Sequence, residues 1–246
     1  AAVKQGQVVL NGMYLNELTG LCRPEELVQL FRYATMLSAQ TGVLIDSAMI
    51  SDVPGYTWGT VTAMARAGIK YFSTAPNYFD RIGTILREWE NKPFYWVGPD
   101  GRDKVLVWIP FWGYAMSHVY NQMSAKLVDD FYAGLEKKGY PYDIAYVRWS
   151  GHGDNAVPDP AICEFVKDWN AKYSWPKFII SGTSDAFRAF EQRYGNQLPR
   201  VRGDWTPYWE DGAGSSALET GLNRQSSDRL ALAETGGGRL TGTGLS

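Results

Sequence analysis

The sequence predicts an α/β fold in which a parallel β-sheet is covered by α-helices. Short runs rich in β-forming residues alternate with longer windows in which apolar residues recur at helical spacing, over most of the 246 residues. Strand–helix–strand units of this kind place successive strands parallel to one another. The alternation alone does not separate a closed barrel from an open doubly wound sheet. No G-x-G-x-x-G or Walker motif follows a predicted strand, which disfavours a nucleotide-binding sheet.

The N-terminal part of the chain contains the first predicted units. A helix begins at Pro24, because proline is favoured in the first helical turn, and ends before Gly42. Its buried face is expected to carry the apolar residues Leu27, Leu30, Phe31, Ala34 and Leu37. A strand over 43–50 follows, and then a helix over 60–67 leads into a strand over 69–73.

The remaining units continue the same alternation. Three further runs are predicted as strands: 105–109, 144–149 and 177–181. The helices among them are expected to begin at the capping residues Ser124, Asp159 with Pro160, and Ser184. The last helix begins with a capping box, Ser216 and Glu219, and extends to about Glu234. Residues 1–234 are therefore expected to form one domain, and the glycine-rich tail 235–246 is predicted to be disordered.

Charge and hydropathy restrict the partners. The net charge is −2, and no block of Lys or Arg is present, so neither nucleic acid nor an anionic membrane surface is expected as a partner. No run of about 18 apolar residues is present, so no membrane span is expected. The first ten residues lack the pattern of a signal peptide. A soluble protein is predicted, and a periplasmic or secreted location is favoured over the cytoplasm.

Acidic residues and aromatic rings occur together in the loops expected to follow strands. In parallel α/β sheets these loops carry the functional groups. Three such loops contain Asp52, then His152 with Asp154, and then Asp204 with Asp211. Glycosidic cleavage requires two carboxyl groups, and aromatic faces suit the C–H faces of sugars. The candidate sugar-binding aromatic residues are Trp58, Trp112, Trp205, Tyr208 and Trp209.

Each of these acids also has a purely structural explanation. Asp52 precedes Val-Pro-Gly and could form an Asx-turn, while Asp154, Asp204 and Asp211 could cap nearby backbone. The aromatic content, 14%, could equally fill a large core. No G-x-S-x-G nucleophile motif is present, so a serine hydrolase is disfavoured.

Several segments resemble glycoside hydrolase family 38, the α-mannosidase family. They are GQVVLNGMYLNE, PEELVQLFRYA, SDVPGYTWGTVTAMARAGIKYFS, GHGDNAVPD and GDWTPYWEDGAGSSALETGLNRQSSDRLALAE, which follow the family's order over residues 5–234. The resemblance implies a (β/α)7-type barrel, here a partial one, a retaining mechanism and a catalytic zinc. It also implies that Asp52 is the nucleophile and a zinc ligand, and that the acid/base loop lies around Asp154 and Asn155.

The chain departs from the family pattern at two places. Asn155 stands where the family has the second Asp of its acid/base pair, so Asp154 or Asp211 would have to supply the proton. The family's His-x-Asp ligand motif is absent, so the zinc ligand set is incomplete, as expected for an internal fragment or a divergent member.

These residues favour a retaining glycosidase acting on α-mannoside-type linkages. The alternatives are a carbohydrate-binding barrel without turnover and a related metal-dependent deacetylase or α-glucan-cleaving enzyme. A carbohydrate is the expected partner in the first two cases. The sequence does not specify the linkage, the aglycone or the oligomeric state.

Overall fold

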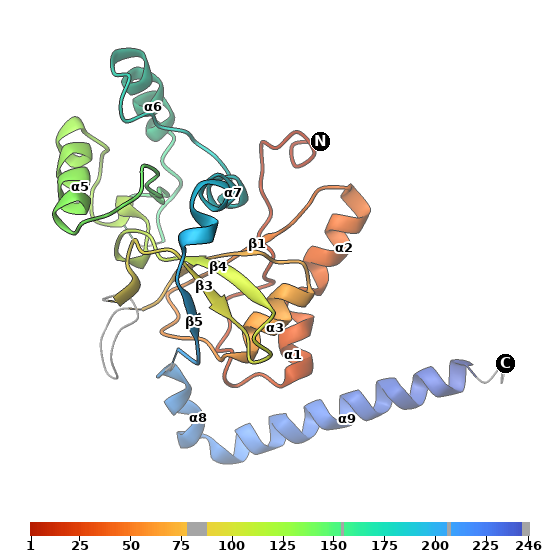
Figure 1. The fold of residues 1–246 in the computed structure, drawn as a ribbon. Coiled ribbons are helices and arrows are strands. Elements are labelled where there is room, and N and C mark those ends of the chain that lie inside the picture. The colour runs from red at the N-terminus through yellow and green to blue at the C-terminus, as the bar shows by residue number, and fades with distance from the viewer. Residues whose placement is uncertain (78–87, 154, 206–207, 243–246) are drawn as a thin grey trace. The chain divides into compact units, whose positions relative to one another are not determined.

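The computed structural model describes residues 1–77, 88–153, 155–205 and 208–242 and divides into two compact units. The first unit is Ala1–Pro207 and the second is Tyr208–Ser246. The predicted domain boundary after residue 234 does not coincide with this division. Within the first unit, one five-stranded sheet has helices on both faces (Figure 1).

The sheet is mixed and open over the described residues. Its strands are β1 (Ser47–Ser51), β2 (Tyr71–Ala75), β3 (Phe94–Val97), β4 (Lys104–Trp108) and β5 (Arg200–Arg202), in the spatial order β1-β2-β4-β3-β5. The pairs β1–β2 and β2–β4 are parallel, as predicted, whereas β3 is antiparallel to β4 and parallel to β5. The α/β class is confirmed, and the described strands do not close into the predicted barrel.

Two predicted strands, 144–149 and 177–181, have no regular secondary structure and belong to no sheet. The backbone N–H and C=O groups of Phe178 bond to the Asn170 side chain at 3.0 and 2.8 Å, so they are not available to a neighbouring strand. The carbonyl of Arg148 likewise accepts from the Met116 amide at 2.8 Å. The prediction is wrong there because side chains and loops satisfy backbone groups that a sheet would otherwise pair.

The helices of the first unit follow most of the predicted boundaries. They are α1 (Pro24–Gln29), α2 (Arg32–Thr41), α3 (Gly59–Arg66), α5 (Ala125–Lys137), α6 (Ala161–Lys172) and α7 (Thr183–Tyr194). Gly42 ends α2 in the left-handed conformation, with φ 71°, and Ser124 accepts from the Leu127 amide to cap α5. Ser184 is not a cap, because its hydroxyl donates to Ser47 Oγ at 2.9 Å from within α7.

Both faces of the sheet are buried. On one face, Ile50, Phe72 and Val107 pack with residues of α1 and α3. On the other face, Trp108 packs against Phe187 and Phe190 of α7 and against other aromatic rings. Burial on both faces is what a sheet covered by crossover helices requires. The carboxyl ends of β1, β2 and β4 are therefore held at one edge of a rigid sheet.

Shortening a side chain in this core is expected to destabilise the protein. Ile50 is 0% exposed, so Ile50→Val should lower the free energy of unfolding by about 0.5–1.5 kcal/mol, because a buried methyl group is removed. Urea denaturation measures this difference. The matched change Ile179→Val, at a residue that is 77% exposed, should alter stability by less than about 0.5 kcal/mol. Equal losses at both positions would contradict the packing described here.

The described residues of the second unit lie mostly in helices. These are the 3₁₀ helix η4 (Trp209–Asp211), α8 (Gly212–Ser215) and α9 (Ala217–Gly242). The Ser216 hydroxyl donates to the Gly212 carbonyl at 3.3 Å and does not form the predicted capping box. Helix α9 continues to Gly242 and so includes residues 235–242 of the predicted glycine-rich tail. Each glycine lowers the stability of a helix by about 1 kcal/mol relative to alanine. Adding residues to an existing helix avoids the cost of nucleation, so a helix can still extend through these glycines.

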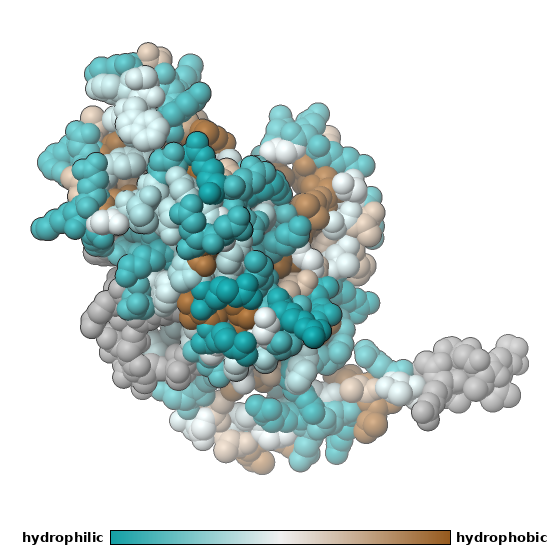
Figure 2. Space-filling view, in the orientation of Figure 1, coloured by the Kyte–Doolittle hydropathy of each residue, from teal (hydrophilic) through white to brown (hydrophobic). Residues whose placement is uncertain are grey.

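The viewed surface is mainly hydrophilic (Figure 2). Hydrophilic residues cover much of the viewed face, and hydrophobic residues form smaller groups among them (Figure 2). Within the described part of the chain, no helix has both the length and the apolar character needed to cross a membrane.

Candidate active site at the carboxyl end of β1

Asp52 directly follows β1 at the carboxyl edge of the sheet. Its backbone has φ 62°, a left-handed conformation uncommon outside glycine but tolerated by Asp. The amide of Asp52 donates to the Ala75 carbonyl at 2.7 Å, which extends the β1–β2 pairing by one bond. This backbone turn leaves the Asp52 side chain exposed.

The carboxylate of Asp52 is oriented by two side chains. Asn77 Nδ2 donates to Asp52 Oδ1 at 2.7 Å, and the Tyr114 hydroxyl donates to the same oxygen at 2.5 Å. Among the described residues, Asp52 Oδ2 has no hydrogen-bond donor. The predicted alternative, an Asx-turn to nearby backbone amides, is not observed, because both donors are side chains from other loops. One oxygen is thus fixed and the other is available for chemistry.

Charged and phenolic groups surround this end of β1. Burial raises the pKa of Tyr56 well above its ordinary value, so its hydroxyl stays protonated. The Asp52 charge raises that pKa further and the Arg148 charge lowers it, so both charges act near the Tyr56 ring. The Tyr56 hydroxyl contacts Thr74 Oγ1 and donates to the Val53 carbonyl at 3.3 Å, which places a neutral ring beneath the loop.

The loop predicted to carry the acid/base residue is described only in part. Asp154 lies outside the described residues. On one side of it, His152 Nε2 lies 3.6 Å from Asp159 Oδ2, and its side chain is 42% exposed. Asp159 also accepts from Trp149 Nε1 at 2.9 Å and from the Ala161 amide at 2.9 Å, so it stabilises the start of α6 as predicted.

Asp159 should make the stability of the protein dependent on acid pH. The hydrogen bond from Trp149 lowers the pKa of this carboxyl, with further contributions from Ala161 and His152. A carboxyl whose pKa is lowered by folding stabilises the folded state above its unfolded pKa, and this stabilisation disappears as the pH falls through the folded value. The Asp159→Asn variant should therefore have a lower free energy of unfolding than the wild type near pH 5. This difference should become smaller as the pH falls toward about 2.5.

Urea denaturation at several pH values measures this trend. Asp168→Asn, which changes an exposed carboxylate on the same helix, is the matched control and should show a small loss at every pH. A loss at Asp159→Asn that is the same at pH 5 and pH 2.5 would contradict the assigned role.

The indole of Trp58, a predicted substrate-binding residue, lies far from Asp52. Trp58 Nε1 donates to the Val97 carbonyl at 2.7 Å, and Val97 pairs with Lys104 at the first residue of β4. This is the opposite end of the sheet from Asp52, about 20 Å away at 3.3 Å per strand residue. Asp204 accepts from the Trp58 amide and from Thr57 Oγ1, before the start of α3. The structure therefore does not bring the Trp58 indole to Asp52, because the intervening loop crosses the sheet face. The predicted roles of Trp58 and Asp204 in substrate binding stay predictions.

The other predicted aromatic residues are distributed differently. Trp205 is 7% exposed, and its indole stacks on Trp96 with ring centroids 4.4 Å apart, so it is a core residue whose faces are not open to a sugar. Trp112 lies in η1 (Phe111–Gly113), and its side chain is outside the described part. The remaining two, Tyr208 and Trp209, lie in or next to η4 of the second unit, as does the predicted residue Asp211.

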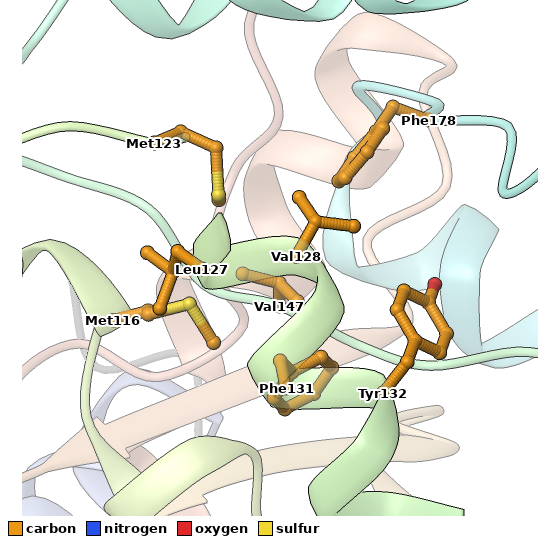
Figure 3. A pocket seen from close by; sticks show the side chains of 8 residues that line it. All are labelled: Met116, Met123, Leu127, Val128, Phe131, Tyr132, Val147 and Phe178. Atoms are coloured by element: carbon orange, nitrogen blue, oxygen red, sulfur yellow. The ribbon is translucent and has the colours of Figure 1, made fainter. Parts of the chain in front are cut away.

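Two cavities are outlined by described residues, and Asp52 lines neither. One has room for about a single water, about 10 Å³, and is apolar (Figure 3). It is lined by Met116, Met123, Leu127, Val128, Phe131, Tyr132, Val147 and Phe178. The other, about 160 Å³, lies between α5 and η1 and is bordered by the ion pair of Lys138 with Glu90, at 3.2 Å.

Three residues of the site were not predicted from the sequence: Asn77, Tyr114 and Arg148. Each follows or ends a predicted strand, at 69–73, 105–109 and 144–149 respectively. Functional groups in parallel α/β sheets follow the strands. The sequence search considered only acids and indoles at these places, so it did not include this amide, phenol and guanidinium group.

The described residues do not fit the implied zinc site. No group of three His, Cys, Asp or Glu side chains within the described ranges is close enough to hold a metal ion. Around Asp52 the donors are an amide and a phenol, whereas zinc sites use His, Cys and carboxylate ligands. Zinc binding therefore remains a prediction from the resemblance.

The chain matches one family model, and its fold is similar to those of two solved structures. A model of the glycosyl hydrolases family 38 N-terminal domain matches residues 1–211. The fold is similar to an alpha-mannosidase from Enterococcus faecalis V583, with 18% identity and a TM-score of 0.62, over 83% of this chain and 23% of that one. It is also similar to a 4-alpha-glucanotransferase from Thermococcus litoralis, with 17% identity and a TM-score of 0.50, over 93% of this chain and 36% of that one.

The family match and the two similar structures support different conclusions. At such low identity the two structures support the fold alone, and the chain spans about a quarter to a third of their lengths. No curated protein matches the chain. The family match covers most of the chain and includes β1, Asp52 and its two hydrogen-bond donors.

Proposed function

Because this chain belongs to glycosyl hydrolase family 38 through its N-terminal domain, we propose that it supplies the nucleophile of a retaining glycosidase. The proposed substrates are α-mannoside-type linkages. The observation that carries the proposal is the Asp52 carboxylate, which is exposed at the carboxyl end of β1 with one oxygen fixed by Asn77 and Tyr114. The location agrees with the rule that parallel α/β sheets place reactive groups at this edge.

The geometry suggests how Asp52 would act. In a retaining mechanism a carboxylate attacks the anomeric carbon, the leaving oxygen takes a proton from a second carboxyl group, and water then hydrolyses the glycosyl-enzyme. Asp52 Oδ2 is the oxygen available for attack. The bonds to Oδ1 restrict rotation of the carboxylate, which reduces the entropy lost on reaching the transition state. We assign the acid/base role to Asp154, with Asp211 as the alternative.

Covalent trapping tests this proposal. A fluorinated α-mannosyl fluoride, which forms a glycosyl-enzyme faster than the adduct hydrolyses, should label one carboxylate. Peptide mapping by mass spectrometry should locate the sugar on Asp52, and α-glucosyl and α-galactosyl analogues should label the protein more slowly. An adduct on another carboxylate, or turnover with inversion at the anomeric carbon, would exclude Asp52 as the nucleophile.

A carbohydrate-binding domain without turnover is the second candidate. It is favoured by the donors around Asp52, an amide and a phenol, which do not make a metal site. Calorimetry with α-mannosides, together with an assay for aglycone release, separates the two candidates. Binding without release would support the second candidate, and release that requires Asp52 would support the first. Loss of acetate from an acetylated sugar would instead indicate a deacetylase.

A further inference from the structure

Arg148 connects the two segments that carry Asp52 and one of its donors. The Arg148 Nη2 group donates to Ser51 Oγ at 2.7 Å and to Met49 Sδ at 2.9 Å, both in β1. The Nη1 group donates to the Gly113 carbonyl at 2.9 Å, at the end of η1. One guanidinium group thus bonds to the end of a strand and to the loop that follows a different strand.

These two anchor points directly precede the interacting pair. Ser51 is followed by Asp52, and Gly113 is followed by Tyr114, whose hydroxyl donates to Asp52 Oδ1 at 2.5 Å. Arg148 therefore bonds to the residue before Asp52 and to the residue before Tyr114, and Asp52 and Tyr114 bond to each other. Displacement of either segment would change the bond between Tyr114 and Asp52.

The local backbone is built for this contact. Gly113 has φ 74°, and a Cβ at that position would lie 3.2 Å from both Ala75 Cα and Pro76 Cδ. A larger residue would therefore be strained and crowded, and the carbonyl that Arg148 contacts would move. The close approach of η1 to the end of β2 depends on this glycine.

Arg148 has no carboxylate partner among the described residues, unlike Arg188 and Arg193. Burial lowers the pKa of its guanidinium, and the ionisable groups that act on it are phenols: Tyr146, Tyr56 and Tyr114. A half-buried cation without a counter-ion costs free energy, which is unexpected for a residue that serves stability alone. Its polar contacts are instead with the two segments of the site.

We propose that Arg148 is a positioning residue that fixes Asp52 and Tyr114 relative to each other. This inference rests on the proposed role of Asp52 as nucleophile. The planar guanidinium can bond to both segments at once, whereas the single ammonium of lysine cannot reproduce the paired geometry. Misplacement of a reacting group by about 1 Å can lower the rate about 100-fold.

A direct probe of the contact does not require catalytic activity. 3-Fluorotyrosine at position 114 should give a ¹⁹F NMR resonance that moves in Asp52→Asn, because the acceptor changes from a carboxylate to an amide. Arg148→Met should shift or broaden the same resonance, and Arg148→Lys should restore it only in part. Arg66→Met removes a guanidinium that is 70% exposed at the other end of the sheet and should leave the resonance unchanged.

Kinetics on an α-mannoside provide the second measurement. Arg148→Ala should lower kcat by about 100-fold with a much smaller change in KM, and added guanidinium ion should restore part of kcat. A ¹⁹F resonance that responds to Asp52→Asn but not to Arg148→Met would overturn the role of Arg148. If no variant, including wild type, hydrolyses a glycoside, the proposed function fails, while the ¹⁹F result still decides whether Arg148 positions the pair.

Discussion

Asp52→Asn is expected to lower kcat for hydrolysis of an aryl α-mannoside by roughly 1000-fold or more, which corresponds to at least about 4 kcal/mol of transition-state stabilisation. The amide is nearly the same size as the carboxylate, and its oxygen can still accept from Asn77 and Tyr114, so the fold should be retained. An amide is a poor nucleophile, so the glycosyl-enzyme should not form. Steady-state release of the aryl group, with a circular dichroism spectrum of the variant, measures both effects.

The control for this variant is Asp130→Asn. Asp130 is a carboxylate on α5, 60% exposed, that pairs with Lys126 and lies outside the proposed site. Its substitution should leave kcat within about twofold and should change stability by less than about 1 kcal/mol. A fully active Asp52→Asn variant would remove Asp52 from the mechanism, whatever the family membership implies.

The position of Asp52 could be predicted because it depends on local pattern. An apolar strand ends immediately before it, and in parallel sheets such ends share one edge. The parallel pairing of β1, β2 and β4 followed from the same strand–helix alternation. The hairpin of β3 and β4 was missed, although Gly98 and Gly101 lie in the turn between these two strands.

The composition of the site could not be predicted in the same way. Tyr114 and Arg148 reach the end of β1 across 62 and 97 residues of sequence, so their contacts depend on how the loops pack over the sheet. The same packing carries Trp58 away from Asp52, although only five residues separate the two, because Tyr56 is buried against Phe72 on the sheet face. Proximity in sequence was therefore a poor guide to proximity at the site.

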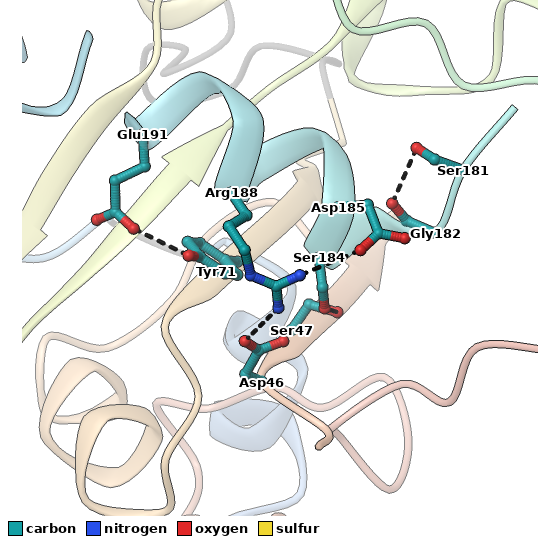
Figure 4. Close-up of polar contacts among 9 residues, drawn as sticks. All are labelled: Asp46, Ser47, Tyr71, Ser181, Gly182, Ser184, Asp185, Arg188 and Glu191. Atoms are coloured by element: carbon teal, nitrogen blue, oxygen red, sulfur yellow. Dashed lines mark hydrogen bonds and ion pairs between the residues drawn. The ribbon is translucent and has the colours of Figure 1, made fainter. Parts of the chain in front are cut away.

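A buried ion pair at the amino end of β1 is expected to stabilise the fold, so Arg188→Met should lower the free energy of unfolding. Asp46 is 2% exposed, and its carboxylate bonds to Arg188 Nη2 at 3.0 Å (Figure 4). Asp46 Oδ1 is buried without a hydrogen-bond donor among the described residues, so Arg188 is the main compensation for this charge. Removing one partner of a buried ion pair typically costs 3–5 kcal/mol, and because Arg188 is 40% exposed, we expect a loss of about 2–3 kcal/mol in the free energy of unfolding.

Arg193→Met is the matched comparison on the same helix. Arg193 contacts Asp143 at 2.8 Å, but their side chains are 56% and 48% exposed, so its removal should cost less than about 1 kcal/mol. In urea denaturation, Asp46→Asn combined with Arg188→Met should cost less than the sum of the single changes, because the double variant leaves no unpaired buried charge. Additive losses would mean that the two side chains act independently. The expected difference between Arg188 and Arg193 follows from burial, since both guanidinium groups lie on α7 and both contact an aspartate.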